Sequence, residues 1–340
     1  MQQELERRVR EKFESGPHVS VHDFQIMEDG HAGLTYGFTV STSGQTDRPN
    51  ETRQYVLKVA PVGIRRSGNT DVFRQAQLLR TLFRVGLPVP DVPFASDGEE
   101  ELGTPYIIME RLPGRTFVIW EPHASFGPDE TDPIWVQTTE ALASIHAYDS
   151  RTGLADWNHR AELDGQVAFW SGILNKAEDE DWKRRGAQLA AALDGCDVTP
   201  GPIGLMHGDY QPGNVLFDGG RLTGIIDWEL ACIGPQNLDV GWLLMMADKQ
   251  CWHPDWSPRI NLSREDVLAI YQAARGRAVE DVDWFQALAC FRMTAIACLN
   301  IKLHRNGRRH DPIWEKFATC VTPLLDRGFS LLNGLEEKVA

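Results

Sequence analysis

Short apolar runs dominate the first third of the chain. Residues 19–27, 34–42, 53–61 and 105–112 are rich in β-branched and aromatic side chains, and turn residues bound each run. Runs of this kind predict β-strands. Two other segments, the highly charged residues 2–14 and residues 71–86, predict helices, the second because its apolar side chains recur at helical spacing up to Gly86.

From about residue 132 onward the pattern changes to one of helices. Apolar positions recur with helical periodicity over residues 133–149, 165–177, 181–193, 263–274 and 284–304. The change predicts an α+β protein of two lobes, a small β-rich one over residues 1–112 and a larger, mostly helical one over residues 113–340. The segment "ERLPG" is the expected joint between them.

A polar cluster interrupts the helical part. In "LMHGDYQPGNVLF", His207, Asp209 and Asn214 stand between two apolar flanks that predict short buried strands. A further strand, "LTGIID", follows the turn "DGGR" and is expected to pair with "NVLF", which would bring Asp227 beside Asp209 and Asn214. Two carboxylates and an amide oxygen suit a hard cation such as Mg²⁺. Each residue alone has a structural explanation as a turn former or cap, but the combination favours a site.

These residues carry a resemblance to a known family. "HGDYQPGN", followed after a hairpin by "IIDWE", resembles the catalytic core of the aminoglycoside phosphotransferase family, within the protein-kinase-like superfamily. The matching segments of protein kinases are H-R-D-x-x-x-x-N and D-F-G, with the same interval from Asp to Asn. The resemblance covers nearly the whole chain and implies a bilobal protein-kinase-like fold.

The resemblance also implies a role for each residue of the core. Asp209 would accept or orient the proton of the substrate hydroxyl, while Asn214 and Asp227 would hold Mg²⁺ at the phosphates of ATP or GTP. His207 would tie the loop to the metal-binding strand. In "PQNLDVGWLL", Asp239 would buttress the catalytic loop through backbone amides, and a plain helix N-cap is the alternative.

The first lobe would then supply the phosphate-covering loop and a lysine. "GHAGLTYGF" is similar to the family pattern G-x-S-N-x-T-Y, so Gly30 and Gly33 are candidates for phosphate binding, although Ala32 and Gly33 replace the usual Ser and Asn. Lys58 stands alone in an apolar strand and needs an anion, which the resemblance identifies as phosphate. The helix glutamate expected beside it is replaced by Gln75.

The segment "IIMERLPG" is the expected seat of the adenine ring. Backbone groups near Met109, Glu110 and Arg111 would be its hydrogen-bond partners, and an ordinary strand and turn is the alternative interpretation. Trp228, directly after Asp227, is the tryptophan expected nearest the site.

Composition and charge limit the classes of molecule that this protein is expected to bind. The net charge of −14 argues against nucleic acid, and the six cysteines form no CxxC pair. The charged N-terminus does not resemble a signal peptide, and no run approaches the ~18 apolar residues of a membrane span, so a cytoplasmic protein is expected. The acceptor could be an aminoglycoside, another hydroxylated amine, a sugar or a metabolite, and the sequence does not indicate an oligomeric state.

Three functions compete at this stage. A small-molecule O-phosphotransferase is favoured because the base and both metal ligands are present. A protein kinase is disfavoured because HGD replaces HRD and no A-P-E segment follows. A non-catalytic nucleotide-binding regulator with a kinase-like fold is the remaining alternative, supported by Gln75 and the altered glycine loop.

Overall fold

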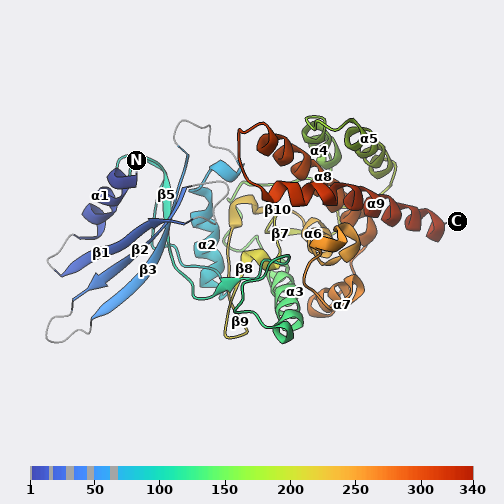
Figure 1. Ribbon diagram of the computed structural model, residues 1–340. Coiled ribbons are helices and arrows are strands. Elements are labelled where there is room, and N and C mark those ends of the chain that lie inside the picture. The colour runs from blue at the N-terminus through green and yellow to red at the C-terminus, as the bar shows by residue number, and fades with distance from the viewer. Residues whose placement is uncertain (1, 15–17, 28–33, 44–49, 62–67, 340) are drawn as a thin grey trace. The chain divides into compact units, whose positions relative to one another are not determined.

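The computed structural model describes residues 2–14, 18–27, 34–43, 50–61 and 68–339 (Figure 1). The chain forms two compact units. The first comprises residues 1–114 together with two short later segments, 151–157 and 223–230, and the second comprises residues 115–150, 158–222 and 231–340. The segment that contains Asp227 therefore belongs to the first unit, whereas Asp209 and Asn214 belong to the second.

The first unit is built on an antiparallel sheet. Its strand order is β1-β2-β3-β5-β4, with β1 Val19–Ile26, β2 Leu34–Thr42, β3 Glu51–Val59, β5 Tyr106–Glu110 and β4 Phe94–Ser96. The strands predicted over 19–27, 34–42, 53–61 and 105–112 are thus confirmed. The two predicted helices are present as α1 Gln2–Phe13 and α2 Arg74–Arg84.

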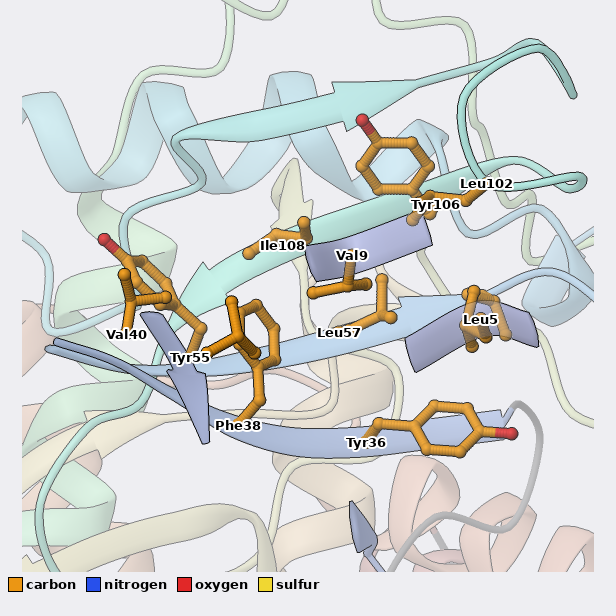
Figure 2. Packing of buried hydrophobic residues seen from close by; sticks show 12 residues of the cluster. Leu5, Val9, Tyr36, Phe38, Val40, Tyr55, Leu57, Leu102, Tyr106 and Ile108 are labelled. Carbon is orange, nitrogen blue, oxygen red and sulfur yellow. The ribbon is translucent and has the colours of Figure 1, made fainter. Parts of the chain in front are cut away.

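One face of this sheet is covered by α1. Tyr36 and Phe38 of β2 alternate with polar neighbours, so their rings project to the same face. There they pack with Leu57 of β3 and with Leu5 and Val9 of α1 (Figure 2). The alternation places the intervening side chains of β2 and β3 on the opposite face, which is the face that carries Lys58.

The second unit is mostly helical. Its helices are α3 Thr131–Ala147, α4 Gln166–Leu174, α5 Glu180–Asp194, α6 Asn237–Ala247, α7 Arg264–Arg275, α8 Val282–Arg305 and α9 Ile313–Val339. The helix α8 packs against α4, α6 and α9. By length and composition α8 could cross a membrane, but 78% of its most apolar window is buried, as in the core helix of a globular protein.

Short strands frame the polar cluster of the second unit. They are β6 Arg115–Thr116, β7 Ile203–Met206, β8 Val215–Asp218, β9 Arg221–Ile225 and β10 Cys232–Pro235. The strands β7 and β10 pair antiparallel, with Met206 opposite Cys232. The strands β8 and β9 are neighbours in a sheet of order β6-β8-β9, and their turn holds two glycines with positive φ angles of 54° and 75°. The predicted hairpin is confirmed.

Candidate active site

In the first unit, Lys58 and Asp227 form an ion pair. Lys58 lies in β3, opposite Thr35 of β2 in the sheet register. Its Nζ donates to Oδ1 of Asp227 at 3.0 Å, and the two side chains are 16% and 37% exposed. A lysine in an apolar strand requires an anion nearby, and in this structure the carboxylate of Asp227 supplies it.

The backbone of Asp227 is in the left-handed region, with φ of 64°. For a residue other than glycine this conformation costs about 1–2 kcal/mol, although aspartate tolerates it better than most. Strained backbones of this kind cluster at functional sites. Lys58 donates to Oδ1 of this carboxylate, and Oδ2 has no partner among the described residues. The carboxylate can therefore bind a cation while it remains paired with Lys58.

The helix α2 contacts this segment through a residue that the motif analysis missed. Arg74 donates through a terminal guanidinium nitrogen to the backbone carbonyl of Glu229. Its guanidinium also lies 5.8 Å from the ring centre of Trp157, whose indole N–H donates to the carbonyl of Arg74 at 3.0 Å. The neighbouring Gln75 is buried, with 2% of its surface exposed. Within the described part of the chain, Gln75 is not a hydrogen-bond partner of Lys58.

In the segment expected to bind adenine, two backbone N–H groups already donate hydrogen bonds within the protein. The N–H of Glu110 donates to the carbonyl of Asp91 at 3.0 Å, and the N–H of Arg111 donates to the carbonyl of Gln54 at 2.9 Å. Met109 lies in β5 opposite Val56. A base bound here would therefore use backbone carbonyls or a different N–H group. Gly30 and Gly33 lie outside the described residues.

In the second unit, a buried aspartate organises the loop after β7. The Oδ2 of Asp239, near the start of α6, accepts the backbone N–H of His207 at 2.6 Å, and its Oδ1 accepts the N–H of Gly208 at 2.9 Å. Gly208 has a φ of 87°, a conformation that favours glycine. Asp239 is 1% exposed and His207 is fully buried. The loop is thus held by its backbone.

His146 and Tyr271 support Asp239 from behind. Asp239 can only accept, so His146 donates through Nε2, 3.3 Å from Oδ2, and its Nδ1 accepts the hydroxyl of Tyr271 at 2.6 Å. Burial lowers the pKa of His146, and it raises the pKa of Tyr271 to about 12. Burial alone would raise the pKa of Asp239, but the hydrogen bond from His146 and those from the loop lower it overall. The aspartate is therefore ionised and the histidine neutral.

The carboxylate of Asp209 is held at both oxygens. Its Oδ1 accepts the indole N–H of Trp242 at 2.9 Å, and its Oδ2 accepts Nδ2 of Asn214 at 3.2 Å. The same Nδ2 donates to the backbone carbonyl of Asp209 at 2.8 Å, which fixes the amide orientation. The Oδ1 of Asn214 is left without a partner within the described chain and is free to bind a metal ion.

The donor chemistry of the two units fits Mg²⁺. Oδ2 of Asp227 in the first unit and Oδ1 of Asn214 in the second have no partner among the described residues. Carboxylate and amide oxygens are ligands that Mg²⁺ accepts alongside water and phosphate. The described residues contain no group of three or more His, Cys, Asp or Glu side chains placed to hold a metal ion. Mg²⁺ commonly needs only one or two protein carboxylates and completes its shell with phosphate and water.

Trp228, the residue after Asp227, is buried in the first unit. It is 1% exposed, and its indole N–H donates to the carbonyl of Ile225 at 3.0 Å. Its ring therefore packs inside the protein. The tryptophan that does reach the loop is Trp242, whose position 33 residues after Asp209 gave no signal in the sequence.

A family model described as the phosphotransferase enzyme family matches residues 43–284. The probable acyl-CoA dehydrogenase IBR3 of Arabidopsis thaliana is 27% identical over 83% of this chain, and the match spans 36% of its own length. The chain thus spans about a third of the length of such relatives. The hygromycin-B 4-O-kinase of Escherichia coli is 24% identical, with 95% of this chain and 94% of the enzyme covered.

A solved structure shares the fold along nearly the whole chain. It is that of a Ralstonia eutropha JMP134 protein assigned as an aminoglycoside phosphotransferase, with a TM-score of 0.74, 19% identity and coverage of 98% of both chains. The prediction of a protein-kinase-like fold with a β-rich first part and a helical second part is confirmed.

Proposed function

Since this chain belongs to the phosphotransferase enzyme family, we propose that it transfers the γ-phosphoryl group of ATP or GTP to a hydroxyl group of a small acceptor. The observation that carries the proposal is the carboxylate of Asp209, which Trp242 and Asn214 fix at both oxygens. A carboxylate held in this way is positioned to orient an acceptor hydroxyl and take its proton as the oxygen attacks phosphorus.

The remaining residues have roles in binding the donor. Lys58 would contact the phosphates while it stays paired with Asp227, and Gly30 and Gly33 would cover them with backbone amides. Mg²⁺, when bound, would neutralise charge on the phosphates and would be held by Asp227 and Asn214. Phosphoryl transfer requires mainly positioning and charge neutralisation from the protein. His207 and Asp239 would keep the loop in shape.

The base of the nucleotide would lie against the segment of Met109, Glu110 and Arg111. Because the N–H groups of Glu110 and Arg111 already donate within the protein, we expect the base to use carbonyls of this segment and the next free N–H along the chain, that of Leu112. Solved structures of the same fold bind AMP-PNP together with hygromycin B, and GDP, so both ATP and GTP are candidate donors.

Two acceptor classes follow from the relatives. Hygromycin-B 4-O-kinase matches along almost its whole length, which favours an aminoglycoside or a related hydroxylated amine. The match to a segment of proteins named as acyl-CoA dehydrogenases favours a hydroxyacyl compound as the second class. Either enzyme would act in the cytoplasm, where the nucleotide is supplied.

The test begins with nucleotide binding. MgATP or MgGTP should raise the melting temperature of the full chain, because a ligand that binds only the folded state stabilises it. Asp227→Ala should abolish this rise, whereas Asp209→Ala should keep it and lose turnover. A rise that persists in Asp227→Ala would contradict the proposed donor site.

Turnover separates an enzyme from a nucleotide-binding regulator. Release of phosphate from MgATP should be measured alone and with a panel of aminoglycosides, other hydroxylated amines, sugars and hydroxyacyl-CoA thioesters. The proposed enzyme hydrolyses MgATP slowly without an acceptor and accelerates with one class of the panel. Binding with no phosphate release under any condition would favour the regulator.

A further inference from the structure

The centre of α8 places a cation between two indole rings. The guanidinium carbon of Arg292 lies 4.2 Å from the ring centre of Trp242, in α6, and 5.2 Å from that of Trp170, in α4. Both distances lie within the range of cation–π attraction. The side chain is thereby held in one orientation by residues from two other helices, although nothing in the family motif involves it.

Arg292 and Trp242 both reach the loop that carries Asp209. A terminal nitrogen of Arg292 donates to the carbonyl of Gly208 at 2.7 Å. The ring of Trp242 stacks on the guanidinium, and its N–H donates to Oδ1 of Asp209 at 2.9 Å. The arginine therefore contacts the loop directly through Gly208 and indirectly through the indole that holds the carboxylate.

The electrostatics favour the same arrangement. Burial lowers the pKa of Arg292, and the carboxylates of Asp209 and Asp239 oppose this shift. An arginine remains charged even so, because its ordinary pKa is far above neutrality. The buried guanidinium therefore places a fixed positive charge close to the carboxylates of Asp209 and Asp239.

We propose that Arg292 is a positioning residue for Asp209, acting through the carbonyl of Gly208 and through the indole of Trp242. It touches neither substrate nor nucleotide in this account, which rests on the proposed function. It sets the direction in which the carboxylate of Asp209 points. Its loss should therefore lower the rate of the chemical step and leave nucleotide affinity unchanged.

The kinetic test uses the full chain and hydrolysis of MgATP with water as acceptor. Trp242→Phe keeps an aromatic ring beside the guanidinium and removes the N–H that binds Asp209, and Arg292→Gln removes the charge. Each should lower kcat by about tenfold or more, as expected for the loss of a hydrogen bond to a charged group, with KM for MgATP within about twofold of the wild type. Arg292→Lys should recover part of the rate.

Matched controls distinguish positioning from general damage. Trp284→Phe removes an indole N–H that donates to the carbonyl of Leu193 at 3.1 Å. Arg264→Gln removes a part-buried arginine that pairs with Asp283 of α8. Neither contacts the loop, so both should keep the wild-type kcat. An equal loss of kcat in the controls, or a rise in KM for MgATP that accounts for the whole effect, would overturn the proposal.

A spectroscopic measurement tests the same contact without activity. The indole N–H signal of Trp242 in a ¹⁵N spectrum can be assigned by its loss in Trp242→Phe. It should shift in Arg292→Gln, move back toward the wild-type position in Arg292→Lys, and stay in place in Arg264→Gln. A signal unmoved in Arg292→Gln would overturn the proposal. A wild type that hydrolyses neither MgATP nor MgGTP would instead count against the proposed function, and the spectra would still decide the role of Arg292.

Discussion

Two aspartates show how differently the two units hold a negative charge. Asp227 has a 37% exposed side chain, a lysine partner at one oxygen, and a second oxygen that no described residue contacts. Asp239 is 1% exposed and accepts hydrogen bonds from two backbone amides and from His146. A carboxylate with a spare oxygen and access to solvent is suited to binding a ligand. A carboxylate that is shut off from solvent and accepts three hydrogen bonds from the protein is suited to holding a loop in place.

The largest effect that would test this contrast is expected at Asp239. In Asp239→Asn the amide NH₂ would face the backbone N–H of His207 or Gly208, so a donor would meet a donor inside the protein. Breaking a buried charged contact in this way should lower the free energy of unfolding by about 3 kcal/mol. Denaturant titration followed by far-UV circular dichroism would measure it. If the free energy of unfolding fell by less than about 1 kcal/mol, as for an exposed ion pair, Asp239 would not differ from Asp227 in its contribution to stability.

The second prediction concerns pH. Burial lowers the pKa of His146 below its ordinary value of 6.5, so the unfolded chain binds this proton at a higher pH than the folded protein does. The stability that neutral His146 contributes is complete above pH 6.5 and is lost as the pH falls through that value toward the folded pKa. The groups facing His146 are Asp239, Tyr271 and Arg275.

Asp239 adds to this trend at lower pH. Its pKa is also lowered from the ordinary value of 3.8, so its contribution is present above that value and is lost below it. Chemical denaturation between pH 8 and pH 5 isolates the histidine. His146→Gln should remove the dependence in this window, and a dependence that persists in the variant would assign it to another group.

A smaller effect on stability is expected at Asp227. The ion pair with Lys58 is partly exposed, and such pairs contribute about 0–1 kcal/mol. Asp227→Asn should therefore change the free energy of unfolding by less than about 1 kcal/mol in the same titration that is used for Asp239→Asn. A loss as large as that of Asp239→Asn would show that Asp227 is also a structural charge.

The smallest effect is expected at Gln75. Gln75→Glu restores the charge that the family places at this helix position, so the variant should be tolerated or should lower the KM for MgATP. Steady-state phosphate release measures it, with Gln75→Ala as the comparison that removes the amide altogether. A clear loss of activity in Gln75→Glu would mean that the alignment of the helix with the family pattern is wrong.

The sequence predicted the helices and strands in which apolar residues recur at regular spacing. It missed the elements in which prolines, glycines or burial on every side obscure that spacing. The strands β1, β2, β3 and β5 of the first unit and five helices of the second follow from alternation and helical spacing, whereas β4 lies in a proline-rich segment that did not predict a strand. The helix α9 was not predicted, because Pro323 and two glycines interrupt its pattern. The helix α6 was also not predicted as a helix. It is apolar on all sides because it is buried on all sides, so it carries no amphipathic signal.

In the candidate site, too, the sequence identified some residues and missed others. Asp209, Asn214 and Asp227 stand in motifs with fixed spacing, and the sequence identified them. Arg292 and Trp242 contact the loop from helices that lie 84 and 33 residues further along the chain, and no local pattern connects them to it. Contacts of that kind depend on how helices pack, which spacing in a sequence does not reveal.

The packing of α1 on the sheet determines where a shortened version of this protein can begin. The segment that matches the family begins at residue 43, after α1, β1 and β2 have ended. A protein that begins at residue 43 and keeps the rest of the chain would lose α1 and the rings of Tyr36 and Phe38, which cover Leu57 and Ile108, and would leave β3 as a bare strand edge. Such edges recruit other chains. Expression of residues 43–340 should therefore give aggregates, whereas the full chain should be recovered in the soluble fraction.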